Sequence, residues 1–291
     1  MHVVYLPRFL FSDKLAVLKL QGPISISASV SFHLPNLETI HLSVLKFPGD
    51  EFMKKLSSSC PVLRELHIIN CYVKATICVE SLSLKSLIRK TRTSQEKVSI
   101  AIKTPNLTYL VLDEYRVSVD IGEMRSLNKA EVNFFVSDFQ VEELLTKVSG
   151  VKYLHLRPEA LLILKELPVF PNLIWLKSYA GKKLSKPLHS APKLKSLIIL
   201  YFNEDLPFDP KFAPEHLPCL ESVEICSFCG NPEELDIVAY FLKAATALKK
   251  MKIIFDCCIS EVTTLLSVFQ ELLDIPRSSA VCQIKISKPD L

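Results

Sequence analysis

The chain has 291 residues, of which 49% are hydrophobic and 23% charged, and its 35 basic and 31 acidic side chains leave a formal net charge of +4. This apolar fraction excludes intrinsic disorder, and the mild positive charge without a dense basic run argues against nucleic-acid binding. The six glycines stand far apart, so glycine-rich phosphate-binding loops are excluded as well.

The sequence shows no sign of a signal peptide or of a membrane-spanning helix. Residues 1–11 do not join a charged start to a sustained apolar stretch, so they do not resemble a signal peptide. The longest uncharged run, from Leu20 to Leu37, holds prolines and serines that a lipid-facing helix would exclude. Within it, apolar residues alternate with serines from Ile24 to Phe32, which predicts one half-buried strand. Nine irregularly spaced cysteines are typical of reduced thiols, so we expect a soluble protein of the cytoplasm or nucleus.

A repeat with the pattern apolar-x-x-apolar-x-apolar runs along the whole chain. Twelve copies occur at intervals of 20 to 33 residues, and in six of them a proline stands two residues before the first anchor. The first anchors are Leu15, Leu37, Leu63, Leu84, Leu107, Leu127, Val151, Leu173, Leu194, Leu220, Leu248 and Val281, and the prolines are Pro35, Pro61, Pro105, Pro171, Pro192 and Pro218.

This repeat predicts an α/β fold, a leucine-rich-repeat solenoid with parallel strands on a concave face. The apolar-x-apolar end of each copy alternates like a short strand, and proline, which has no N–H to donate, fits just before it. One copy cannot bury its own apolar side, so the copies should stack. The remaining residues return on the opposite face, where helices are expected from Asp50 to Ser58 and from Ser137 to Val148, with Ser137 as the N-cap.

The last third departs from the short period. Asn231, Pro232 and the acidic pair Glu233 and Glu234 form a strong helix start, because a capping side chain and a proline precede acids at the positive end of the helix dipole. A second helix is expected from 260 to 273. The alternation of strands and long helices predicts a separate α/β capping module, so we divide the chain into a repeat region, 1–214, and a C-terminal domain, 215–291.

The C-terminal module resembles the FBD domain of plant F-box/LRR-repeat proteins, and two upstream segments resemble the repeats of the same family. The segments that carry the resemblance are His216–Ile225, Gly230–Leu235, Val238–Leu242, Ala247–Met251 and Pro276–Ile284 in the module, and Leu34–Leu42 and Leu56–Leu66 in the repeats.

The resemblance implies a non-enzymatic protein-recognition module, like the substrate receptor of an SCF-type ubiquitin ligase, with a protein substrate on the concave face. In that family an F-box docks on a Skp-type adaptor. Only 14 residues precede Leu15 here, so this adaptor is expected as a partner only if an F-box lies upstream. The alternative is a stand-alone repeat scaffold or decoy without a ligase connection.

Residue types that could carry catalysis or metal binding have structural interpretations. Cys226 and Cys229, with Cys257 and Cys258, show the one spacing that resembles a zinc site, but adjacent cysteines point to opposite sides of a strand. Cys219 near His216 is interpreted as a strand entry, and the Glu142/Glu143 and Glu233/Glu234 pairs as helix-start acids. A hydrolase using Cys219 or Glu234 is the third, least favoured class. We therefore predict no catalytic residue, no metal ligand and no cofactor.

The exposed side of the strand face is the candidate site. Residues beside the second anchor of each copy should stack into columns, and His41 and His67 in one column are interpreted as solvated strand residues. Exposed aromatic side chains beside Arg and His have the composition of protein-binding hot spots, although strands favour aromatic residues in any case. The predicted protein-binding residues are Tyr109, Tyr153, His155, Arg157, Trp175, Lys177 and Tyr179.

Overall fold

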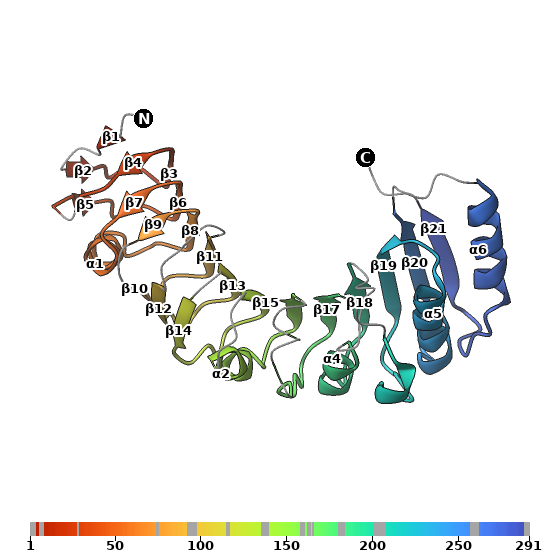
Figure 1. The fold of residues 1–291 in the computed structure, drawn as a ribbon. Helices are drawn as coiled ribbons and strands as arrows, with labels where there is room; N and C mark the ends of the chain where they lie inside the picture. The colour runs from red at the N-terminus through yellow and green to blue at the C-terminus, as the bar shows by residue number, and fades with distance from the viewer. Residues whose placement is uncertain are drawn as a thin grey trace. The chain divides into compact units, whose positions relative to one another are not determined.

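The computed structural model of the protein is drawn as a ribbon in Figure 1. It contains two compact units, Met1–Val151 and Lys152–Leu291. The structure describes residues 4–5, 9–27, 29–73, 76–91, 98–114, 117–134, 140–157, 161, 164, 166–179, 184–200, 208–256 and 262–287.

In the first unit, six strands pair in parallel, each with the strand of the next repeat along the chain. In chain order they are β3 (Val17–Gln21), β6 (Thr39–Ser43), β8 (Glu65–Ile69), β11 (Ser86–Thr91), β13 (Tyr109–Glu114) and β15 (Lys129–Phe134).

The second unit repeats this arrangement with six further parallel strands, so each of the twelve predicted copies contains a strand. They are β16 (Tyr153–Leu156), β17 (Trp175–Ser178), β18 (Ser196–Ile199), β19 (Ser222–Phe228), β20 (Lys250–Phe255) and β21 (Gln283–Ser287). The leucine-rich-repeat fold predicted from the sequence is thereby confirmed.

The anchors lie in the core, as the alternation predicts. In β6, for example, Ile40 and Leu42 are buried while His41 between them is half-buried on the other face. Burying such a side chain contributes about 1.5–3 kcal/mol relative to leaving it exposed, which explains why the anchor positions recur.

The six prolines occupy a recurring turn that leads into each strand. In the second repeat the Leu37 N–H donates to the Leu34 carbonyl at 3.1 Å, with Pro35 as the second residue of the turn. The same bond closes the turns from Cys60 to Leu63 and from Thr104 to Leu107. Proline suits this position because its fixed φ matches the turn and its missing N–H is not needed there.

Return segments of the first unit form shorter parallel ladders of their own. Strands β1 (Val4–Tyr5), β4 (Ile24–Ser25), β7 (Lys46–Phe47) and β9 (Tyr72–Val73) form one, β10 (Ile77–Glu80), β12 (Val98–Lys103) and β14 (Val117–Ile121) a second, and β2 (Phe9–Phe11) and β5 (Ser31–His33) a third.

The single strand predicted from Ile24 to Phe32 was wrong. Its ends belong to two short strands, β4 and β5, which pair with different neighbours. Between them the Val30 N–H donates to the Ser27 carbonyl at 3.2 Å, so the chain turns there. The alternation of apolar residues and serines survives such a turn, and therefore could not reveal it.

The helices follow the sequence more closely. Helix α1 spans Asp50–Ser59, and α2 spans Gln140–Lys147 within the predicted segment, whose proposed cap Ser137 lies outside the described residues. In the second unit, α4 (Ser185–Ser190) and the short 3₁₀ helix η1 (Pro210–Phe212) precede the longer helices α5 (Pro232–Ala244) and α6 (Val262–Asp274). The ring of Phe269 in α6 packs edge to face on Phe255 at the end of β20, with centroids 5.8 Å apart.

One anchor position of the first unit holds a charge. In β11, Leu87 is followed on the buried face by Arg89, and its Nε lies 2.7 Å from Oε1 of Glu114 at the end of β13. Both side chains are 98% or more buried. Burial raises the pKa of the Glu114 carboxyl to about 7, and the positive charge of Arg89 opposes this shift only in part.

We therefore expect the contribution of Glu114 to stability to fall as pH rises. Because its pKa is higher in the folded than in the unfolded chain, the folded state binds more protons between the two values, and that stability is lost as pH rises through about 7. The free energy of unfolding of the wild type minus that of Glu114→Gln should decrease from about pH 5 to about pH 8, measured by urea titration followed by circular dichroism. A difference that increases with pH would contradict the expectation.

Candidate functional site

Each six-stranded ladder has a buried face, which carries the anchors, and an opposite face that we call the outer face. The residue that follows the second anchor of each copy lies on the outer face because neighbouring side chains of a strand alternate. These residues are Lys19, His41, His67, Ile88, Val111 and Glu131 in the first unit and His155, Lys177, Ile198, Glu224, Lys252 and Lys285 in the second.

Six of the seven predicted binding residues lie in, or directly after, two neighbouring strands of the second unit. Tyr153 and His155 lie in β16 with Arg157 just after it, and Trp175 and Lys177 lie in β17 with Tyr179 just after it. Spacing by two residues within a strand keeps Tyr153 with His155, and Trp175 with Lys177, on the outer face. The ring of Tyr179 lies against that of His155. The parallel register places Tyr153 beside Trp175 and His155 beside Lys177. We call these six residues the β16–β17 patch.

Aromatic contacts order the β16–β17 patch. The Tyr153 and Trp175 rings lie 6.4 Å apart between centroids at an angle of 48°, and the His155 and Tyr179 rings lie 6.5 Å apart and nearly parallel at 12°. The side chain of Tyr153 is 36% exposed, and the other five are half-buried. Packed rings of this kind present apolar area with little loss of side-chain freedom on binding, which is a property of binding hot spots.

The β16–β17 patch carries a cation, Lys177, that could meet an acidic partner. Lys177 has no ion-pair partner among the residues that the structure describes. The neighbouring acids are already engaged: Glu224 lies 3.5 Å from the Lys252 ammonium, and Glu221 lies 2.6 Å from that of Lys249. An acidic group that approached the patch would therefore face a cation.

Tyr109, the seventh predicted residue, belongs to the first unit and has a separate set of contacts. Its hydroxyl donates to Oε1 of Glu131 at 2.7 Å, and the Lys129 ammonium lies 4.5 Å from its ring centroid. Burial, followed by the hydrogen bond to Glu131, raises the pKa of its hydroxyl. Whether Tyr109 shares a partner with the β16–β17 patch stays a prediction.

The structure also locates the acidic and cysteine residues that the sequence offered as catalytic or metal-binding candidates. Glu234 is buried at the start of α5, where its side chain accepts backbone N–H bonds, so the helix-start interpretation is confirmed. Cys219 lies in the turn before β19, which confirms that it marks a strand entry. Cys226 is half-buried in β19, where burial raises the pKa of its thiol, and Cys229 is exposed. Cys257 and Cys258 lie outside the described residues.

None of the helices in the described part of the chain is long and apolar enough to span a membrane.

Two protein-family models match separate parts of the chain. A family model described as FBD matches residues 209–253, and one described as "FBD-associated F-box protein At5g56370, LRR repeats" matches residues 2–131. No solved structure matches.

Several proteins of Arabidopsis thaliana are similar over nearly the whole chain. F-box/FBD/LRR-repeat protein At1g78750 is 29% identical over 96% of this chain and 68% of its own length. F-box/FBD/LRR-repeat protein At5g22660 is 31% identical over 97% of this chain and 70% of its own length. Probable FBD-associated F-box protein At1g32375 is 28% identical over 97% of this chain and 71% of its own length.

The fold and the outer face define a leucine-rich-repeat protein whose second unit ends in an α/β segment with long helices. The chain belongs to the F-box/FBD/LRR-repeat protein family, as the relatives of about 30% identity over most of its length show. Members of this family are protein-interaction modules of the F-box type. The division of this chain at residue 215 stays a prediction.

Proposed function

We propose that this chain is the partner-recognition part of an SCF-type ubiquitin-ligase substrate receptor, and that it acts by binding rather than by catalysis. The substrate would be a protein that docks on the outer face of the second unit, at the β16–β17 patch. Tyr109, in the first unit, stays a separately predicted protein-binding residue. The family membership supports the ligase connection, since the relatives are named as F-box proteins.

One observation carries the choice of surface. Two aromatic pairs and an unpaired lysine meet on neighbouring strands of a ladder whose opposite face holds the core. Rigid strands hold these side chains in place before a partner arrives, and such pre-organisation lowers the entropy lost on binding. Amphipathic rings next to a cation suit a partner segment that offers acidic and apolar side chains.

Replacing Tyr153 and Trp175 together with alanine should abolish capture of the partner. If each ring contributes roughly 2 kcal/mol, as hot-spot residues do, each replacement should weaken binding about 30-fold. The tagged protein, expressed in plant cells from its own gene, would be precipitated with its partners, and the partners compared quantitatively between wild type and Tyr153→Ala/Trp175→Ala.

Two internal controls sharpen this experiment. Phe212→Ala removes an aromatic ring that is 65% exposed elsewhere in the second unit, and it should leave capture unchanged. A Skp-type adaptor should precipitate equally with every variant, because the patch does not contact it. Partners that persist with the double variant would refute the patch. Absence of the adaptor from the wild-type precipitate would refute the ligase role and leave a stand-alone scaffold.

A further inference from the structure

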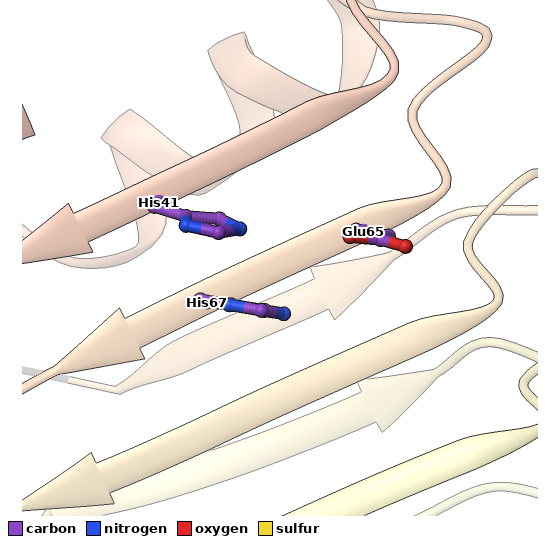
Figure 2. A group of neighbouring side chains, drawn as sticks. All are labelled: His41, Glu65 and His67. Carbon is purple, nitrogen blue, oxygen red and sulfur yellow. The ribbon is translucent and has the colours of Figure 1, made fainter. Parts of the chain in front are cut away.

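Two histidines and a glutamate gather on the outer face of the first unit. Figure 2 shows His41 on β6 and His67 and Glu65 on β8, with the three side chains on the same side of the two strands. One ligand atom from each of these side chains lies within 4.8 Å of the other two. Among the residues that the structure describes, no other cluster of His, Cys, Asp or Glu meets this condition.

The local structure explains the cluster. Strands β6 and β8 pair in parallel with His41 directly beside His67, and their rings stack with centroids 4.0 Å apart at an angle of 14°. Glu65 precedes His67 by two residues, so the alternation of the strand places its carboxylate on the same face. Backbone hydrogen bonds thus hold three ligand-bearing positions in fixed register.

One imidazole nitrogen of this cluster has no hydrogen-bond partner among the described residues. Nε2 of His41 is shielded from solvent and has no hydrogen-bond partner in the described part of the chain. A buried polar atom without a partner is costly and calls for an explanation, such as a bound ion. Burial and then the charge of His41 lower the pKa of His67, which is consistent with the neutral form that binds metals.

Two other features of the neighbourhood bear on the choice of ligand. Stacked rings can simply cover a sheet, but stacking alone leaves the buried nitrogen of His41 unsatisfied. The nearby cations Lys19 and Lys90 also lower the pKa of His67, whereas the Glu65 carboxylate raises it. An anion would gain from the lysines but would meet the Glu65 carboxylate, whereas a cation finds three donor groups.

We propose that His41, His67 and Glu65 bind a divalent transition-metal ion, with zinc as the preferred ion. Two imidazoles and one carboxylate form the ligand set of zinc sites that keep a fourth position open. Ligand atoms about 2.0–2.1 Å from a tetrahedral ion lie roughly 3.3 Å apart. The two rings would therefore turn out of their stack on binding, which brings together ligand atoms that already lie within 4.8 Å of one another. The open position would accept water or a side chain of a partner.

Cobalt(II) titration of the full chain is the direct test, with a reducing agent present to keep the cysteines free. The wild type should bind one equivalent with the visible bands of a nitrogen and oxygen ligand set, and zinc should displace the cobalt. His41→Ala and His67→Ala should each weaken binding by at least about 100-fold, because loss of a ligand exceeds the 10–100-fold effect of outer-shell changes. Glu65→Gln should weaken it less than either histidine variant.

The controls separate loss of the site from loss of the fold. His216→Ala, which removes an exposed histidine of the second unit, should titrate like the wild type. Zinc should raise the melting temperature of the wild type but not of His41→Gln, whose unbound melting temperature shows whether it folds. A cobalt spectrum that persists in His41→Ala/His67→Ala, a spectrum dominated by thiolate bands, or no binding by the folded wild type would each overturn the proposal.

Discussion

Replacing Arg89 with alanine is expected to lower the free energy of unfolding of the first unit by about 3–5 kcal/mol at pH 8. The Arg89 side chain is 2% exposed and lies 2.7 Å from Glu114, which is 1% exposed. At this pH the Glu114 carboxyl is ionised, since its pKa is about 7. Without arginine, which lowers the pKa of this carboxyl, Glu114 must either stay charged without a counter-ion or take up a proton, and both cost free energy. A cavity also remains where the large, buried Arg89 side chain had been.

Urea unfolding followed by circular dichroism, together with hydrogen exchange of the amides of β11 and β13, would measure this loss. An exposed pair offers the matched control: Arg125 lies 2.6 Å from Glu123, but their side chains are 85% and 74% exposed. Arg125→Ala should change stability by at most about 1 kcal/mol, because water already solvates both charges. If Arg89→Ala and Arg125→Ala lower the free energy of unfolding equally, burial of the Arg89–Glu114 pair is not the cause of the loss.

The double replacement Arg89→Leu/Glu114→Leu shows whether the loss of stability in Arg89→Ala comes from an unpaired buried charge or from lost packing. It restores the apolar anchor of the other repeats and removes both desolvated charges, so it should be far less harmful than Arg89→Ala and can equal the wild type in stability. A double variant as unstable as the single one would show that packing alone, rather than an unpaired charge, causes the loss.

Replacing Glu234 with alanine is expected to lower the free energy of unfolding of the second unit by about 2–4 kcal/mol. One hydrogen bond to a charged group contributes roughly 1.5–3 kcal/mol, and bonds that share one oxygen atom do not add in full. Oε2 of Glu234 accepts from the backbone N–H groups of Cys229, Gly230 and Asn231 at 2.8, 2.5 and 3.1 Å. The carboxylate is 2% exposed, so water cannot easily replace it. It holds the turn between β19 and α5.

Trp175 is the single tryptophan of the chain and lies in the second unit, so its fluorescence would follow this unfolding. The neighbouring Glu233 is exposed, and Glu233→Ala should cost only the few tenths of a kcal/mol expected for one exposed charge near a helix N-terminus. Glu234→Gln, which keeps one acceptor oxygen, should fall between the two. If Glu233→Ala and Glu234→Ala destabilise the unit equally, the three backbone bonds do not matter.

Most of the fold could be predicted because the same repeat pattern occurs many times in the sequence. Each strand copies the same apolar alternation, and a turn with proline at its second position introduces half of them. The start of α5 was equally predictable, since the capping box between Asn231 and Glu234 depends on residues only three positions apart. Such local signals do not need knowledge of distant partners.

Features that depend on distant partners were missed or misjudged. Arg89 stands where the pattern calls for a third apolar anchor, and that break was a signal of a buried charge, but its counter-ion could not be named. His41 and His67 were interpreted singly as solvated residues, whereas strand register stacks their rings and buries one nitrogen. The segment from Ile24 to Phe32 divides between two ladders because its ends find different neighbours.

The sequence by itself therefore determined the repeat, its strands, its proline turns and the α/β character of the C-terminal part. It also carried the resemblance of the chain to its family. These properties follow from spacing within about 30 residues, where backbone geometry and apolar periodicity act directly. Only the tertiary structure decided which side chains of successive repeats make contact, such as the stacked rings of His41 and His67 and the buried pair of Arg89 and Glu114. That outcome depends on strand register and on the burial of charge, which arise when repeats pack against one another.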